Sequence, residues 1–84
     1  MENVIVVYTS SGCSYCEKVK NLLEEQEVDF VEKNISESET FFKEWRTKEV
    51  LGTPSTFLNE EEVVGFDKNK LIQLVEKYKE VVKN

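Results

Sequence analysis

A run of five apolar residues at positions 4–8, Val-Ile-Val-Val-Tyr, stands near the start of this 84-residue sequence. The run consists mainly of β-branched residues, which is typical of a central strand buried on both faces. We therefore expect helices on both sides of the sheet that contains it. A chain of this length can bury only one small core, so residues 1–84 are predicted to form a single domain.

The residues that follow alternate between helix and strand patterns. After a turn at 9–12, Val19, Leu22 and Leu23 recur at helical spacing up to about Gln26. A period-two pattern then predicts a strand over residues 29–35.

A second helix is predicted after the candidate N-cap residues at 36–39. It carries Phe41, Phe42 and Trp45, which could be read as a stacking platform. Their helical spacing favours a structural role, and we expect at least two of the three in the core.

The last third of the chain predicts a hairpin and a helix. Two short strands near 56–58 and 62–64 are joined around Asn59 and Glu60. Asp67 is the expected cap of a final helix with an apolar stripe that includes Leu71 and Leu74. The order βαβαββα predicts an α/β fold in which a parallel pair and an antiparallel pair share one mixed sheet.

Charge and composition exclude several classes of partner. The chain has 17 acidic and 11 basic residues, no histidine and a net charge of −6, so nucleic acid and anionic membranes are not expected to bind. No apolar run reaches 18 residues, and Met1 is followed by an acidic residue rather than by a basic leader segment. We therefore expect a cytoplasmic protein.

The two cysteines, Cys13 and Cys16, open the first predicted helix. Two cysteines without a histidine cannot complete a tetrahedral zinc site, so no metal ligand is assigned. A bond across so short a loop would stabilise the fold little, which favours a reactive pair over a structural one. The helix N-terminus favours a thiolate at Cys13, whereas Cys16 lies one turn further in and is expected to be covered. The pattern predicts a redox dithiol in which Cys13 attacks and Cys16 resolves.

Three motifs together, "CSYC", "GTPS" and "VVGFD", resemble those of glutaredoxins over nearly the whole chain. The resemblance implies a thioredoxin-like fold with a four-stranded mixed sheet and three helices. It also implies an oxidoreductase that reduces protein disulfides or glutathione mixed disulfides, with glutathione as co-substrate and no obligatory cofactor. Thr53 and a cis Pro54 would then lie along the cysteines, while Gly65, Phe66 and Asp67 would hold the γ-glutamyl end of glutathione. Tyr15, between the cysteines, is placed to flank the same ligand.

Four positions depart from the common pattern of that family. Ser14 replaces a proline. By resemblance, family members with serine at this position are those that hold a [2Fe-2S] cluster at a dimer interface, and a cluster-binding dimer is therefore an alternative to a monomeric enzyme. Ser10 replaces a lysine, Val64 replaces a glycine and Val50 replaces a glutamine. The change at Ser10 leaves less positive charge around Cys13, and the changes at Val64 and Val50 concern the glutathione site. The "GFD" form is also seen in small bacterial glutaredoxin-like proteins, which leaves a thioredoxin-type reductase as an alternative electron donor. We expect a monomer.

Overall fold

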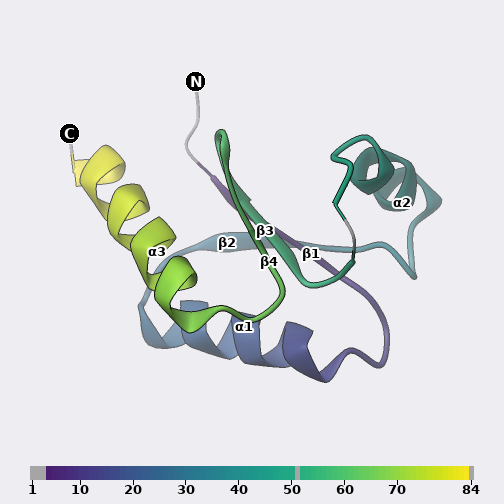
Figure 1. The fold of residues 1–84 in the computed structure, drawn as a ribbon, viewed down its shortest axis with the longest axis horizontal. Helices are drawn as coiled ribbons and strands as arrows, with labels where there is room; N and C mark the ends of the chain where they lie inside the picture. Colours follow the sequence, from purple (N-terminus) through teal and green to yellow (C-terminus); the bar gives the residue numbers. More distant parts are fainter. Residues whose placement is uncertain (1–3, 51, 84) are drawn as a thin grey trace.

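The computed structural model of the protein describes residues 4–50 and 52–83. Four strands form one sheet in the order β2-β1-β3-β4, and three helices flank it (Figure 1). Strand β1 runs parallel to β2 and antiparallel to β3, and β4 runs antiparallel to β3. The predicted element order and the mixed sheet are confirmed. In chain order the elements are β1 (Ile5–Thr9), α1 (Ser14–Glu25), β2 (Phe30–Asn34), α2 (Glu39–Arg46), β3 (Ser55–Leu58), β4 (Glu61–Val64) and α3 (Lys68–Lys83).

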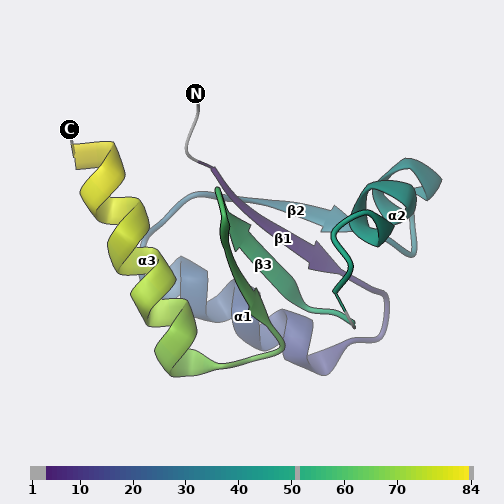
Figure 2. The same ribbon diagram turned by 45° about the horizontal axis from the view of Figure 1, so that its top comes forward.

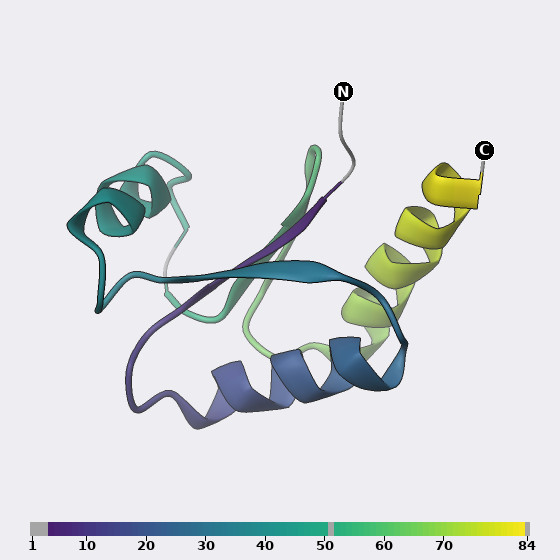
Figure 3. The ribbon, with the colours of Figure 1, turned by 180° about the vertical axis from the view of Figure 1, so that it is seen from behind.

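One face of the sheet is covered by α1 and α3, which lie on the same side in both views (Figures 1 and 3). Ile5 and Val7 of β1 are fully buried under these helices. Their neighbours in the register include Leu58 on β3 and Phe30 on β2. Apolar residues of the two helices complete the core: Val19, Leu22 and Leu23 from α1, and Leu71, Leu74 and Val75 from α3.

The opposite face of the sheet is covered less completely. Helix α2 lies at one end of this face (Figure 2) and has no buried residue. Phe41 and Trp45 are only half-buried, and Phe42 is 39% exposed. The prediction that at least two of these aromatic residues belong to the core is therefore wrong. Helical spacing identifies an apolar face, but this eight-residue helix meets only the end of the sheet.

The helix starts follow the capping residues that the sequence contains. Ser38 is the N-cap of α2, and its hydroxyl accepts a hydrogen bond from the backbone N–H of Phe41 at 3.2 Å. The carboxylate of Asp67 accepts one from the backbone N–H of Lys70 at 3.2 Å, as predicted for the start of α3. None of the helices in the described part of the chain combines the length and the apolar content that a membrane span requires.

Candidate active site

Cys13 and Cys16 are joined by a disulfide bond, with their Cα atoms 5.3 Å apart. Cys13 is the N-cap of α1 and has an extended backbone conformation. The backbone N–H of Cys16 donates to the Cys13 sulfur at 3.2 Å. Such a bond, together with the positive end of the helix dipole, stabilises negative charge on the Cys13 sulfur once the disulfide is reduced.

The two cysteines differ in exposure. Cys16 is only 1% exposed, whereas Cys13 is half-buried. The prediction that Cys16 is the covered member of the pair is confirmed. A substrate arriving from solvent therefore meets the Cys13 sulfur first, because the body of the helix and the sheet cover the other sulfur.

The loop before the disulfide turns sharply at Gly12, where the backbone φ is 76°. This left-handed conformation carries little cost for glycine and a larger one for residues with a Cβ atom. The turn brings the chain from the carboxyl end of β1 to the start of α1, where Cys13 lies.

The segment before β3 meets this loop through side-chain hydroxyls. The Thr53–Pro54 peptide bond is cis, as the resemblance to glutaredoxins implied. The Ser10 hydroxyl lies 2.6 Å from the Thr53 hydroxyl. The Pro54 carbonyl in turn accepts a hydrogen bond from the backbone N–H of Gly65 at 2.7 Å. These contacts connect the loop before Cys13, the Thr53–Pro54 segment and the end of β4.

The remaining predicted site residues have structural contacts as well. Phe66 is partly buried and packs against the core, and Asp67 caps α3. Tyr15 is 56% exposed, and the Lys18 ammonium lies 5.2 Å from the centre of its ring. Tyr15 is therefore accessible beside the disulfide, whereas Phe66 and Asp67 have packing and capping roles that require no ligand.

A cleft of about 320 Å³ opens beside the disulfide, on the side of β2. Both cysteines line it, together with Lys20 of α1 and Glu32 of β2. Lys20 pairs with the Glu17 carboxylate at 2.8 Å and with that of Glu32 at 3.2 Å. These two bonds raise the pKa of Lys20, and the bond to Glu17 has the larger effect. Sequence reasoning missed this cluster, although Lys20 lies four residues after Cys16 and therefore on the same helix face.

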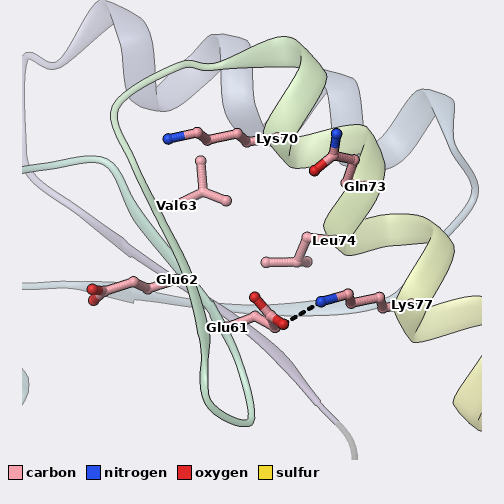
Figure 4. Close-up of a pocket in the computed structure, with 7 residues that line it drawn as sticks. All are labelled: Glu61, Glu62, Val63, Lys70, Gln73, Leu74 and Lys77. Atoms are coloured by element: carbon pink, nitrogen blue, oxygen red, sulfur yellow. Dashed lines mark hydrogen bonds and ion pairs between the residues drawn. The ribbon is translucent and has the colours of Figure 1, made fainter.

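A second cleft, of about 240 Å³, lies between β4 and α3 (Figure 4). Val63 and Leu74 form its apolar base, and an ion pair joins Lys77 to Glu61 across it. None of the predicted site residues lines this cleft, and it contains neither cysteine. We assign it no part in the chemistry of the disulfide.

Comparison with known proteins identifies the family to which the chain belongs. The glutaredoxin family model matches residues 5–63. An uncharacterized glutaredoxin-like 8.6 kDa protein in the rubredoxin operon of Clostridium pasteurianum is 29% identical over 75 residues, which are 88% of this chain and 100% of that protein. The N-acetyl-S-hydroxy-L-cysteine reductase of Bacillus subtilis is 51% identical over 35 residues, which are 42% of this chain and 38% of the reductase.

Solved structures agree with the fold described above. A mutant of a thioredoxin-like protein superposes with a TM-score of 0.78 and 28% identity, over 84% of this chain and 97% of the other. The glutaredoxin-like NrdH-redoxin from Escherichia coli, described as having a thioredoxin-like activity profile, superposes with a TM-score of 0.75. It is 21% identical and covers 83% of this chain and 92% of its own. With its thioredoxin-like fold, its Cys13–Cys16 pair and the matching family model, this chain belongs to the glutaredoxin family of thiol–disulfide oxidoreductases.

Proposed function

We propose that this protein reduces protein disulfides and glutathione mixed disulfides, with Cys13 as the nucleophile and Cys16 as the resolving thiol. The observation that carries the proposal is the unequal exposure of the bonded pair at the start of α1. Cys13 is partly accessible, and its sulfur accepts a hydrogen bond from the backbone N–H of Cys16, which is itself only 1% exposed. An accessible, stabilised thiolate is what attack on an external disulfide requires.

The reaction transfers two electrons from the protein to the substrate. The Cys13 thiolate attacks one sulfur of the substrate disulfide, a new S–S bond forms, and the first substrate thiolate leaves and takes up a proton. Cys16 then loses its proton and attacks the Cys13 sulfur, which releases the second substrate thiol. The product is the Cys13–Cys16 disulfide, the form that the structure contains. Two external thiol groups, or a reductase, return the pair to its reduced form.

The proposed substrate site consists of the residues that the resemblance to glutaredoxins assigns to it: Tyr15, Thr53, Pro54, Gly65, Phe66 and Asp67. The hydrogen bonds from Ser10 to Thr53 and from Gly65 to Pro54 support this grouping, because they hold the Thr53–Pro54 segment beside the cysteine loop. The glutathione thiol would react at Cys13, with its peptide groups lying along the Thr53 backbone.

A different electron donor, a thioredoxin-type reductase, is the second candidate. Among the residues that the structure describes, Lys20 is the one cation that lines the cleft beside the disulfide, and two carboxylates already pair with it. Position 10, a lysine in many relatives, is a serine bonded to Thr53. Neither position therefore offers an unpaired ammonium for a carboxylate of glutathione. The thioredoxin-like activity profile of the similar NrdH-redoxin supports the same alternative.

Two assays distinguish these candidates. Turnover of a small mixed disulfide is measured with glutathione and glutathione reductase, and in parallel with thioredoxin reductase as the electron source. Turnover only with glutathione and glutathione reductase supports glutathione as the electron donor. Turnover only with thioredoxin reductase supports that reductase as the donor. If neither system supports turnover, although the reduced protein is chemically intact, the proposed activity is wrong.

The roles of the two cysteines are tested by substitution. Cys13→Ser should abolish disulfide reduction, because no accessible thiolate remains. Cys16→Ser should retain exchange with small glutathionylated substrates, because in that route only the first thiol attacks. Equal loss in both variants would contradict the assignment of roles.

An iron–sulfur cluster at a dimer interface is the remaining alternative. In the structure the Cys13 sulfur is bonded to Cys16, and the described residues contain no group of three His, Cys, Asp or Glu side chains placed to hold a metal ion. The sequence has two cysteines, Cys13 and Cys16, so a cluster would need a second copy of the chain and outside thiols such as glutathione. We propose a monomeric cytoplasmic enzyme instead, because the bonded pair by itself is sufficient for thiol–disulfide exchange. A coloured dimer obtained by purification without oxygen would contradict this choice.

A further inference from the structure

Two loops meet at Ser10, three residues before Cys13. One follows β1 and ends at Cys13, and the other joins α2 to β3 and contains the Thr53–Pro54 bond. Ser10 and Thr53 are 43 positions apart in the sequence, yet their hydroxyl oxygens are 2.6 Å apart. This distance is that of a strong O–H···O hydrogen bond.

Each loop is also attached elsewhere, to a different part of the molecule. The backbone N–H of Ser11 donates to the Ser36 hydroxyl at 3.0 Å, which ties the first loop to the turn after β2. The Pro54 carbonyl is bonded to Gly65, which ties the second loop to the end of β4. The hydroxyl pair is a direct side-chain link between the two loops, and it holds Thr53 against the loop that ends at Cys13.

We propose that Ser10 is a positioning residue, which holds Thr53 against the loop that ends at Cys13 and so orders the surface on which a disulfide substrate binds. Both residues are partly buried, so the bond is shielded from full competition by water. In such a pair one hydroxyl donates to the other, and the second keeps its own O–H free for a further acceptor. The pair therefore links the two loops and leaves one hydroxyl hydrogen available to donate.

This role rests on the proposed function, because it assumes that the substrate lies along Thr53. A residue that orders the binding surface, without taking part in bond formation, should change the KM more than the kcat. Loss of one neutral, partly buried hydrogen bond corresponds to a change in KM of about three- to tenfold.

The test uses single turnover of the full-length reduced protein with a glutathionylated peptide, at increasing peptide concentration. This assay needs no external reductase, so its outcome does not depend on the identity of the electron donor. Ser10→Ala should raise the half-saturating peptide concentration by about three- to tenfold and leave the limiting rate within about twofold. Ser10→Thr, which retains the hydroxyl, should restore the wild-type value. Ser11→Ala is the matched control, since the neighbouring bond is made by the Ser11 backbone and survives the substitution.

A double-mutant cycle tests whether Ser10 acts through Thr53. Thr53→Val removes the partner hydroxyl and nearly preserves the shape of the side chain. If Ser10 acts through this bond, the half-saturating peptide concentration of the Ser10→Ala/Thr53→Val double variant should be no higher than that of the more strongly affected single variant. Additive effects of the two substitutions would overturn the proposal, and so would a wild-type half-saturation value for Ser10→Ala.

Two further outcomes separate this proposal from others. The pH midpoint of Cys13 alkylation should be the same in Ser10→Ala and wild type; a shift would mean that Ser10 acts on the thiolate, and positioning would be the wrong role. If the wild-type protein itself fails to react with the peptide, the proposed function fails. If wild type reacts and Ser10→Ala matches it, only the positioning role fails.

Discussion

Helices α1 and α3 bury their apolar residues against one face of the sheet, whereas every residue of α2 on the other face stays at least partly exposed. On the first face Leu23 and Leu71 are 0% exposed. On the second, Val31 and Val64 of the sheet are 45% and 47% exposed, because α2 reaches only one end. The two faces are therefore stabilised by different forces.

Polar contacts hold α2 where apolar packing does not. Glu44 accepts a hydrogen bond from the Tyr8 hydroxyl and pairs with the Lys33 ammonium at 2.7 Å. Because Tyr8 lies on β1 and Lys33 on β2, this single carboxylate ties α2 to the two strands. The disulfide belongs to the packed side through α1, while Thr53 and Pro54 follow α2. The active site thus joins a half with a buried apolar core to a half in which polar bonds attach the helix to the sheet.

The largest expected effect comes from truncating the packed face. Leu23→Ala leaves a cavity in a fully buried position and should lower the free energy of unfolding by about 2 to 5 kcal/mol. Phe42→Ala on α2 is the matched control on the other face; with 39% of the side chain exposed, it should cost clearly less. Urea unfolding followed by circular dichroism measures both. Equal losses would show that α2 is packed as tightly as α1.

A smaller effect is expected from removing the hydroxyl that anchors α2. Tyr8→Phe keeps the ring, which packs edge-on against Phe57, and deletes the bond to Glu44. The loss should be about 1 to 2 kcal/mol, since the acceptor is charged but keeps its Lys33 partner. Hydrogen exchange should then rise in α2 and stay unchanged in α1. Uniform acceleration in both helices would contradict the independence of the two faces.

The packed half of the fold was the more predictable from sequence. A β-branched run and the spacing of Val19, Leu22 and Leu23 specify a buried strand and the helix above it, because burial demands uniform apolar character there. The burial of Phe41 and Trp45 could not be predicted in the same way. An apolar helix face indicates that something covers it, but how much depends on where the connecting loops place the helix.

The contacts of the site also differ in how well the sequence predicts them. Cys13 and Cys16 are close in sequence, so helical geometry alone predicts their different exposure. The contacts of Ser10 with Thr53 and of Lys20 with Glu32 join residues distant in sequence, and no local sequence pattern indicates which of these segments meet in the fold. For Asp67 the cap was predicted from its residue type, and the structure confirms that role.

An intermediate loss is expected at the start of α2. Ser38→Ala removes the hydroxyl that accepts the Phe41 N–H and should cost about 1 kcal/mol. Ser38→Asp retains an acceptor and should preserve stability. Thermal unfolding of both variants measures the difference. If Ser38→Ala melts at the wild-type temperature, capping contributes nothing to α2, and the contacts of Glu44 must suffice to hold the helix.

The smallest expected effect depends on pH. The bond from Lys33, and after it the bond from Tyr8, lower the pKa of Glu44 below its ordinary value of 4.5. A lowered pKa in the folded protein means that the ionised form is stabilised by folding. The contribution of Glu44 is therefore complete above the ordinary value and is lost as the pH falls through the lowered one.

Glu44→Gln should accordingly reduce the urea midpoint at neutral pH and flatten its decline in acid, so that the variant and wild type converge at low pH. Glu37→Gln removes the same charge from an exposed position and serves as the control. Its unfolding midpoint should follow the wild-type pH dependence. The side chain of Glu44 is partly open to water, which keeps the change small. If Glu44→Gln and Glu37→Gln behave alike, net charge rather than the Tyr8–Glu44–Lys33 contact controls the acid stability of the α2 face.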